Sequence, residues 1–277
     1  MPLPRSRKSL GQHFLTDPGI LARIVAALDP APDDEVVEIG AGTGTLTRTL
    51  AARVGQVIAI EKDGRLAIEC SMRNAECGIA NVKVVEGDAL RLDWPGLIPH
   101  SAFRTPHFKI VGNIPYNITT PLLERAVALH PERIVFLVQA EVADRIAAAP
   151  GSKVYGGLSV GIQTLCRVER LFTVRAGSFA PPPRVHSAVI RLSRRPDPPI
   201  GDAEIAPFRV FVTACFSRRR KQLRNVVRAV SGAAPPAVEA GLAALGLDPA
   251  ARPETLAPTA FVRLWRWVLA SGGVIVK

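Results

Sequence analysis

Short apolar runs alternate with amphipathic segments along most of the chain, up to about residue 195. Runs rich in β-branched side chains predict buried strands at residues 36–39, 57–60, 82–85, 108–112 and 134–138. Apolar residues at helical spacing predict helices at residues 17–28, 46–54, 119–129, 141–149 and 158–165. Alternating patterns predict two further strands at residues 167–175 and 186–192. Strands that alternate with helices in this way predict an α/β fold.

The alternation stops at a proline-rich stretch, residues 196–199, and the patterns beyond it are all helical. One predicted helix covers residues 217–230, and the last helix has apolar residues at core spacing from Phe261 to Leu269. We therefore expect two domains, which suits a chain of 277 residues. The first is an α/β domain over residues 1–196 with a basic N-terminal arm, and the second is a helical domain over residues 197–277.

A glycine-rich turn, Gly40-Ala41-Gly42-Thr43-Gly44, joins the first predicted strand directly to a helix. A strand, a glycine turn and a helix form the first unit of a nucleotide-binding α/β fold, because glycine lets the backbone approach a ligand closely. Position 45 is threonine, so the dinucleotide fingerprint is incomplete, and the lysine of a P-loop is absent. The pattern better suits a nucleoside without phosphates, such as S-adenosylmethionine; the alternative is a turn that binds no ligand.

Carboxylates follow the next two predicted strands. Glu61 ends the strand at 57–60, where an acidic side chain can accept hydrogen bonds from both ribose hydroxyls. Asp88 follows the strand at 82–85, where it can accept a hydrogen bond from an adenine amine. An isolated carboxylate at a strand end is commonly just solvated, but the neighbouring glycine turn favours a nucleoside site.

Asn113, Ile114, Pro115 and Tyr116 follow the predicted strand at 108–112. The amide of Asn113 and the Ile114 carbonyl can accept hydrogen bonds from an exocyclic amine. Pro115 restricts the backbone on both sides of its peptide bond, and Tyr116 offers a ring face for a base. The alternative is an ordinary turn at a strand end. The proline-rich loop at 178–183 contains Phe179, which is either a second stacking face or a core residue.

The charge balance indicates a polyanionic partner. The chain has 35 Lys and Arg against 24 Asp and Glu, a formal net charge of +11, and excess positive charge of this size is typical of nucleic-acid-binding proteins. The predicted helix at 217–230 concentrates basic residues and favours RNA over a merely solvated face. The candidate RNA-binding residues are Arg218, Arg219, Arg220, Lys221, Arg224 and Arg228.

The cysteines and the N-terminus argue against other classes. Cys70, Cys77, Cys166 and Cys215 form no Cys-x-x-Cys pair and have no histidine cluster near them, so we expect no metal site and a reducing compartment. No apolar run reaches the roughly 18 residues of a membrane span. The basic N-terminus lacks an apolar secretory segment, so we expect a cytoplasmic protein without a membrane partner.

Taken together and in order, these motifs resemble the KsgA family of rRNA adenine-N6,N6-dimethyltransferases. The matching cofactor and target motifs are residues 11–15, 38–44, 61, 87–89 and 113–116. Further similar stretches are residues 139–146, 150–159, 178–192, 216–225 and 251–256. The resemblance runs over nearly the whole chain.

The resemblance implies a Rossmann-like class I S-adenosylmethionine-dependent methyltransferase with a small all-helical C-terminal domain. It implies that Asn113 to Tyr116, with Phe179, form the catalytic site. The residues it implies for binding S-adenosylmethionine are His13, Leu15, Gly40, Gly42, Glu61, Asp88 and Asn113. His13 departs from the asparagine that many relatives have at this position.

The resemblance also implies the reaction. It is dimethylation of N6 on two adjacent adenines in the 3′-terminal hairpin of 16S rRNA during ribosome biogenesis, with S-adenosylhomocysteine as product. The implied partner is the immature small ribosomal subunit, and the protein is expected to be a monomer. Ile114 is more usual in the related Erm enzymes, which methylate large-subunit rRNA, so Erm-like specificity is one alternative. Residues 150–159 and 252–254 resemble KsgA instead. A ribosome-assembly factor without essential catalysis is the other alternative.

Overall fold

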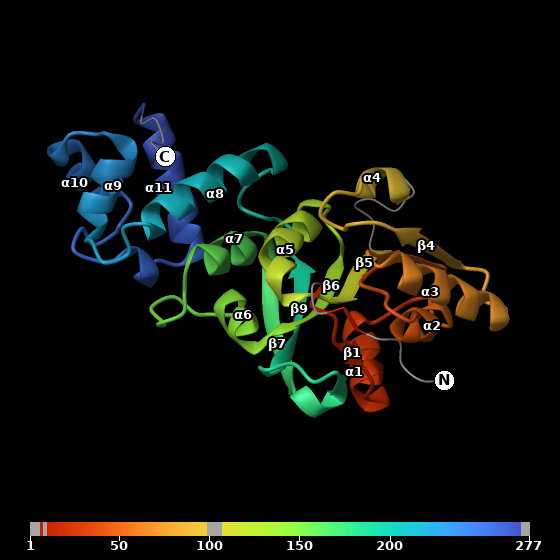
Figure 1. Ribbon diagram of the computed structural model, residues 1–277. Coiled ribbons are helices and arrows are strands. Elements are labelled where there is room, and N and C mark those ends of the chain that lie inside the picture. Colours follow the sequence, from red (N-terminus) through yellow and green to blue (C-terminus); the bar gives the residue numbers. More distant parts are fainter. Residues whose placement is uncertain (1–5, 8–9, 99–106, 273–277) are drawn as a thin grey trace. The chain divides into compact units, whose positions relative to one another are not determined.

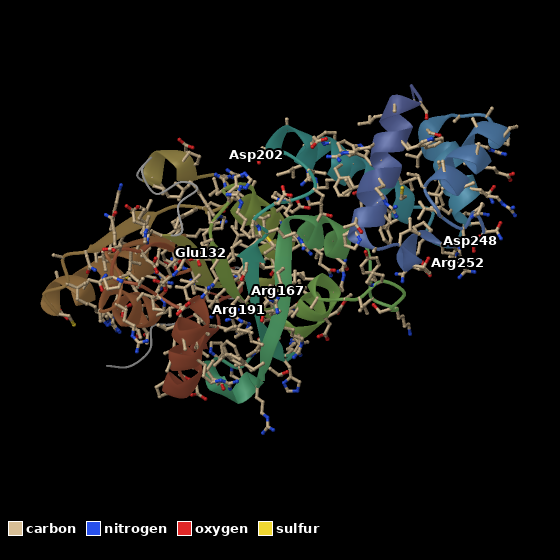
Figure 2. All side chains as sticks on the ribbon, turned by 180° about the vertical axis from the view of Figure 1, so that it is seen from behind. Glu132, Arg167, Arg191, Asp202, Asp248 and Arg252 are labelled. Carbon is tan, nitrogen blue, oxygen red and sulfur yellow. The ribbon has the colours of Figure 1, made fainter. Side chains whose placement is uncertain are left out.

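The computed structural model describes residues 6–7, 10–98 and 107–272 (Figures 1 and 2). The chain divides into two compact units. The first unit consists of residues 1–143 and 167–194, and the second consists of residues 144–166 and 195–277. This division differs from the expected domains chiefly in residues 144–166, which group with the C-terminal helices. The reason is packing, because the helix of this segment contacts the C-terminal helices.

The first unit contains a seven-stranded sheet in the order β4-β3-β2-β5-β6-β9-β7. Its strands are β2 Glu35–Ile39, β3 Gln56–Glu61, β4 Val82–Glu86, β5 Phe108–Asn113, β6 Arg133–Gln139, β7 Cys166–Val174 and β9 Ser187–Arg194. The pairs from β4 through to β6 are parallel, and β9 runs antiparallel to β6. A separate two-stranded antiparallel sheet pairs β1 Phe14–Leu15 with β8 Phe179–Ala180. The predicted α/β fold is confirmed.

The helices predicted at residues 17–28, 46–54, 119–129 and 141–149 are present, whereas two further helices, at residues 64–76 and 94–97, were not predicted. Those of the N-terminal part are α1 Pro18–Leu28, α2 Thr45–Ala51, α3 Gly64–Glu76, α4 Trp94–Leu97, α5 Thr119–Ala128 and α6 Ala140–Ile146, with short 3-10 turns at Tyr116–Ile118 and Ala176–Ser178. Helix α1 starts where the sequence indicates, because the Asp17 carboxylate accepts hydrogen bonds from the backbone N–H groups of Gly19 and Ile20. None of the helices in the described residues is long and apolar enough to cross a membrane.

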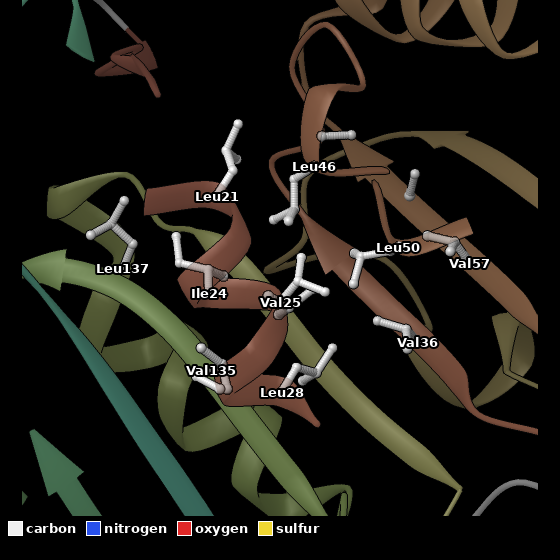
Figure 3. Packing of buried hydrophobic residues seen from close by; sticks show 14 of the residues in the cluster. Leu21, Ile24, Val25, Leu28, Val36, Leu46, Leu50, Val57, Val135 and Leu137 are labelled. Atoms are coloured by element: carbon white, nitrogen blue, oxygen red, sulfur yellow. The ribbon is translucent and has the colours of Figure 1, made fainter. Parts of the chain in front are cut away.

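The first unit has its main core on one face of the sheet (Figure 3). Helix α1 contributes residues at i, i+3, i+4 and i+7 spacing, namely Leu21, Ile24, Val25 and Leu28. They pack with α2 and with alternate strand residues, including Val36, Val57, Val135 and Leu137. Each fully buried aliphatic side chain stabilises the fold by about 1.5–3 kcal/mol. This core holds the strands whose ends form the candidate site.

The second unit is helical, with α7 Gly157–Leu165, α8 Asp202–Phe216, α9 Leu223–Ser231, α10 Pro235–Ala244, α11 Pro258–Ala270 and a 3-10 turn at Pro253–Thr255. Its core includes an edge-to-face pair of Phe208 and Trp265, with ring centroids 5.5 Å apart. The hydroxyl of Tyr155 donates to the carbonyl of Leu256 at 2.9 Å, which joins residues 144–166 to the C-terminal part. In α11, Leu269 is 47% exposed, so it is not the core residue that the spacing predicts.

The predicted helix at 217–230 is wrong at its start. Residues 217–222 form a turn, and α9 begins at Leu223. The backbone N–H groups of Leu223 and Arg224 donate to the carbonyls of Ala251 and Pro249. These donors are therefore satisfied by a distant loop, and the helix does not extend back through the basic residues.

A buried lysine ties together the amino ends of β5 and β6. Lys109 is 4% exposed, and its Nζ lies 2.7 Å from Asp34 Oδ2 and 2.6 Å from the Asp29 carbonyl oxygen. The carboxylate of Glu132, labelled in Figure 2, lies 3.4 Å from the same Nζ. A buried ammonium is tolerable only because these oxygens replace its water.

We expect Lys109→Ala to lower the free energy of unfolding by about 3–5 kcal/mol, because it leaves the buried Asp34 carboxylate without its partner. Urea denaturation would measure the loss. The matched control is Lys83→Ala on β4, where the side chain is exposed and the change should stay within about 0.5 kcal/mol. Equal stability of the two variants would contradict this role for Lys109.

Candidate functional site

A pocket of about 130 Å³ lies at the carboxyl ends of β2, β3 and β5 in the first unit. Ligands of open α/β sheets bind at this end of the strands. Most residues suggested by the sequence meet there: His13, Gly40, Gly42, Glu61, Asp88, Asn113, Ile114, Pro115 and Tyr116 line the pocket. Segments far apart in the chain therefore form one site.

The glycine turn brings the end of β2 close to the end of β5. Gly40 and Gly42 have φ values of +77° and +57°, which side chains other than glycine rarely adopt. A Cβ atom on Gly40 would lie 3.2 Å from the backbone oxygen of Asn113. The turn therefore presents bare backbone to the pocket, which gives a ligand room to lie against it.

Glu61 fixes the turn to the end of β3. Its Oε2 accepts a hydrogen bond from Gly42 N–H at 2.8 Å, and its Oε1 accepts one from Asp63 N–H at 2.8 Å. The side chain is buried, and burial raises the pKa of Glu61, while the backbone hydrogen bonds act in the opposite direction. Each carboxylate oxygen has a further lone pair, so both can still accept a hydrogen bond from a ligand hydroxyl.

Asp63 supports the candidate site and was not singled out from the sequence. Its carboxylate accepts hydrogen bonds from Arg65 Nη2 at 2.8 Å and from Gln12 Nε2 at 3.2 Å. The hydrogen bond from Arg65 is the main reason that the pKa of Asp63 falls to about 2. Asp63 therefore anchors the segment before β1 and, through its N–H, also holds Glu61. The sequence feature that could have identified Asp63 is its place immediately before α3, where an acidic residue is a favoured N-cap.

Asp88 follows β4, which in the sheet order lies on the other side of β2 from β5, the strand that ends at Asn113. Its Oδ2 accepts a hydrogen bond from Lys62 Nζ at 2.8 Å, and its Oδ1 accepts one from Leu90 N–H at 3.0 Å. The bond from Lys62 is the main cause that lowers the pKa of Asp88. The group is thus held as a carboxylate, an acceptor suited to an amine.

Asn113 is oriented by the N-terminal segment. Its Nδ2 donates to the backbone oxygen of His13 at 2.8 Å, across 100 positions of sequence. This contact uses the amide's donor side, so its oxygen remains an acceptor for a ligand amine. Ile114 has a buried side chain, and its N–H donates to the carbonyl of Leu137 at 3.0 Å. This hydrogen bond fixes the peptide that joins Asn113 to Ile114.

Tyr116 is held by a serine that the sequence gave no reason to single out. The hydroxyls of Tyr116 and Ser187 lie 2.7 Å apart in a hydrogen bond, and Ser187 is fully buried at the start of β9. Burial raises the pKa of Tyr116. Anchoring the hydroxyl fixes the plane of the ring at the pocket wall.

His13 contributes both its backbone and its ring. Its Nδ1 lies 2.8 Å from the carbonyl oxygen of Pro181, so Nδ1 carries the hydrogen and donates. The ring lies near that of Tyr116, with centroids 6.0 Å apart and planes inclined by 23°. Leu15 lies deeper: it packs against the core and lines a neighbouring smaller cavity.

Phe179 belongs to the core. It is 4% exposed and packs within the cluster on α1 and the sheet, and β1–β8 pairing places it opposite Leu15. The expectation of a second stacking face at Phe179 is therefore not met in this conformation, because no open ring face reaches the pocket. The core reading, left open by the sequence, is the one that the structure supports.

The basic residues belong to the second unit. Arg218, Arg219, Arg220, Lys221 and Arg228 line an open concavity of about 490 Å³. Arg224 is exposed on the same helix as Arg228. Among the residues that the structure describes, no acidic side chain lines this concavity, which we name the basic concavity.

Arg219 differs from its basic neighbours because much of its guanidinium is already engaged. Its Nε donates to Glu254 Oε2 at 2.9 Å, and its Nη2 donates to the Lys153 carbonyl at 2.7 Å. Gly151 N–H in turn donates to the Glu254 backbone oxygen at 2.7 Å. Arg219 therefore joins three segments of the second unit.

Comparison with known proteins shows similarity over both units. The family model of the ribosomal RNA adenine dimethylases matches residues 4–243. A ribosomal RNA small subunit methyltransferase A from Nitratidesulfovibrio vulgaris is 42% identical over 97% of this chain and 98% of its own length. A protein of the same name from Nitrosococcus oceani is 41% identical over 96% of this chain and 97% of its own length.

Solved structures show the same similarity. A dimethyladenosine transferase from Plasmodium falciparum has a TM-score of 0.82 at 26% identity, covering 95% of this chain and 100% of that one. The 23S rRNA methyltransferase ErmE has a TM-score of 0.71 at 30% identity, covering 92% of this chain and 99% of that one. The fold is thus that of known rRNA adenine methyltransferases.

We expect Asp63→Ala to loosen the segment that carries Gln12 and His13. Losing one charge-assisted hydrogen bond, about 1.5 kcal/mol, should speed amide hydrogen exchange at residues 10–15 by about tenfold. Gln12→Ala should reproduce the effect without removing the cap of α3. The control is Asp33→Ala at an exposed position. Unchanged exchange in Asp63→Ala would exclude the anchoring role.

Proposed function

The chain belongs to the ribosomal RNA adenine dimethylase family, and we propose that it dimethylates N6 of two adjacent adenines in the 3′-terminal hairpin of small-subunit rRNA. That it is an rRNA adenine methyltransferase, acting on RNA, follows from the family itself. The observation that carries the proposed chemistry at N6 is the orientation of the Asn113 amide by the His13 carbonyl, at the end of β5 and beside Tyr116. The relatives named ribosomal RNA small subunit methyltransferase A support the small subunit as the source of the substrate.

The methyl donor in this proposal is S-adenosylmethionine, and S-adenosylhomocysteine is the product. The residues fit such a ligand, because the glycine turn leaves its backbone bare where a Cβ on Gly40 would crowd Asn113. Glu61 would accept hydrogen bonds from the ribose hydroxyls, and Asp88 would accept one from the adenine amine. When bound, the donor supplies a methyl group on a positively charged sulfur.

The acceptor amine is a poor nucleophile because its lone pair is delocalised into the purine ring. The Asn113 side-chain oxygen and the Ile114 carbonyl would accept hydrogen bonds from the two N–H groups of the amine. These hydrogen bonds would pull the hydrogens out of the ring plane, which localises the lone pair on nitrogen. The contacts of Asn113 with His13 and of Ile114 with Leu137 hold these acceptors in place before the base arrives. Positioning of this kind supplies up to about 7–11 kcal/mol in favourable cases.

The target base has to leave its stack, which costs a few kcal/mol. Stacking on an aromatic ring returns about 1–3 kcal/mol per base. Tyr116 is the ring that the pocket offers, and its hydrogen bond to Ser187 sets the ring plane. With Phe179 in the core, the stacking role is assigned to Tyr116.

The RNA partner in this proposal is the immature small ribosomal subunit, and the protein acts on it in the cytoplasm as a monomer. The basic concavity and Arg224 would contact phosphates, since the described lining contains five basic residues and no acidic one. Arg219 has a different part: it holds the concavity together through Glu254 and Lys153 and supplies at most its remaining N–H groups to RNA. The free cysteines among the described residues fit a reducing compartment.

Specificity for large-subunit rRNA is the competing function, because ErmE also shares the fold and Ile114 is usual in Erm enzymes. Two segments favour the small subunit. Residues 150–159 and 252–254, which resemble KsgA, are joined by the Arg219 contacts to Lys153 and Glu254. They thus shape the unit that carries the basic concavity. An assembly factor without catalysis is not favoured, because the pocket retains the complete acceptor set.

The deciding experiment offers immature small-subunit particles and protein-free large-subunit rRNA separately, with labelled donor, and maps the modified adenines. We expect two adjacent dimethyladenines in the small-subunit hairpin and none in the large-subunit RNA. Label only in the large-subunit RNA would establish the Erm-like alternative. Particle binding without any label would establish the assembly factor.

We expect Asn113→Ala to reduce methylation by more than about 100-fold, because the amine loses its main acceptor. RNA binding, measured by filter binding, should persist. Asn113→Asp keeps an acceptor oxygen and should retain more activity than the alanine variant. Near-normal turnover of Asn113→Ala would contradict the proposed role of Asn113 as an acceptor for the amine.

We expect Lys221→Ala and Arg228→Ala each to weaken RNA binding and to reduce the slope of log K against log salt by about 0.7–0.9, the contribution of one phosphate contact. Arg219→Ala should differ, because it mainly breaks contacts inside the second unit and should lower the melting temperature. Unchanged salt dependence in both Lys221→Ala and Arg228→Ala would show that RNA binds away from the basic concavity.

A further inference from the structure

Arg125 is a half-buried arginine of α5 that the proposed reaction does not use. Its guanidinium reaches a loop far earlier in the chain, residues 87–93 between β4 and α4, which we name the Asp88 loop. Nη1 donates to the carbonyl of Leu90 at 2.8 Å, and Nη2 donates to the carbonyl of Leu92. Because the N–H groups of a guanidinium form a rigid planar fork, two such bonds restrict the backbone of the loop.

A buried tryptophan holds a third carbonyl of the Asp88 loop. Trp94 is fully buried, and its Nε1 donates to the carbonyl of Ala89 at 2.9 Å. The Cζ atom of Arg125 lies 5.3 Å from the centroid of the Trp94 ring, within the range of a cation–π contact. The two side chains therefore support each other, and together they fix three carbonyls of one short loop.

The backbone held in this way determines where Asp88 lies. Gly87, Asp88 and Ala89 all line the main pocket. The Asp88 carboxylate accepts a hydrogen bond from Leu90 N–H at 3.0 Å, and the Asp88 carbonyl accepts one from Leu92 N–H at 3.0 Å. A Cβ atom on Gly87 would lie 2.7 Å from the Leu92 side chain, so Leu92 packs on the pocket-lining backbone. A shift of Leu90 or Leu92 would therefore shift Asp88.

Lys62 also contacts Asp88 but does not fix its position. Its Nζ lies 2.8 Å from Asp88 Oδ2, and its side chain is 56% exposed. An exposed ammonium on a flexible stem can follow a carboxylate that moves, and such a pair contributes little to a fixed geometry. Arg125 and Trp94 act on the backbone instead, so the direction of the carboxylate depends on them.

The helix that carries Arg125 is itself fixed. Leu122, Leu123 and Ala126 of α5 are fully buried. The helix begins at Thr119, directly after the 3-10 turn Tyr116–Ile118, whose residues line the main pocket. The guanidinium therefore reaches the Asp88 loop from a rigid element that starts at the pocket.

We propose that Arg125 is a positioning residue that sets the nucleobase selectivity of the donor site, because it holds the Asp88 carboxylate against the exocyclic amine of adenine. Among the described residues that line the pocket Arg125 is absent, so it acts through the Asp88 loop. A fixed carboxylate accepts a hydrogen bond from the amine and repels a carbonyl oxygen at the same place. A carboxylate on a loose loop can turn away, so the site would reject hypoxanthine less. The inference rests on the proposed function, since it takes an adenosyl ligand.

The test is titration calorimetry with S-adenosylhomocysteine and with S-inosylhomocysteine, in which a carbonyl oxygen replaces the amine of the base. We expect the unmodified protein to bind the adenosyl compound about 100-fold more tightly, the effect of one hydrogen bond to a charged group. In Arg125→Ala this preference should fall by about tenfold. Arg125→Lys keeps a donor for one carbonyl and should lie between the two.

Two further variants separate positioning from a general loss of stability. Trp94→Phe keeps the ring but removes the Nε1 donor to Ala89, and it should lower the preference by about threefold. The matched control is Arg133→Ala. Arg133 also donates from Nη1 to a backbone carbonyl, that of Leu28 at 3.3 Å, but it lies at the start of β6. Its loss should leave the preference unchanged.

The outcomes separate the two proposals. A preference unchanged in both Arg125→Ala and Trp94→Phe, or lowered equally in Arg133→Ala, would overturn the role of Arg125. Equal binding of the two ligands by the unmodified protein would overturn it as well. No binding of S-adenosylhomocysteine by the unmodified protein would overturn the proposed donor itself. Because each preference compares two ligands in one protein, lower stability cancels, and Arg125→Lys with Trp94→Phe decides the question where Arg125→Ala does not fold.

Discussion

The pocket depends on one buried carboxylate. Glu61 accepts hydrogen bonds from Gly42 in the turn after β2 and from Asp63 after β3, so it fixes two adjacent strand ends in one position. The glycine turn can follow this path only because its residues tolerate positive φ. Since the carboxylate keeps free lone pairs, the group that builds the pocket is also the group that can hold a ribose. The same carboxylate would therefore serve both the folding of the turn and the proposed binding of ribose.

The part of the pocket around Asn113 and Tyr116 is built by contacts between distant segments. The His13 carbonyl takes the donor side of the Asn113 amide, and Ser187 takes the hydroxyl of Tyr116. In the proposed reaction, each contact occupies a group that catalysis would not need and leaves an amide oxygen or a ring face available to the target base. The geometry is thus prepared before substrate binds, which is how positioning lowers a barrier.

Buried charges recur in this fold with different solutions. Lys109 is surrounded by oxygens and forms ion pairs, and Asp63 is paired with Arg65. Glu38 has only Thr47 and remains neutral near pH 7. The difference is that Glu38 lines a cavity next to the glycine turn, and one of its carboxyl oxygens has no hydrogen-bond partner among the described residues.

The sequence by itself determined most strands and helices of the first unit, the glycine turn and the polar residues at strand ends, because periodicity and glycine conformation are local properties. Tertiary structure decided what local pattern cannot carry. It placed Phe179 in the core, began α9 at Leu223 through backbone bonds to a distant loop, and enlisted Asp63 and Ser187. Which side chain faces a pocket depends on partners far along the chain, so it is set only when the strands pack.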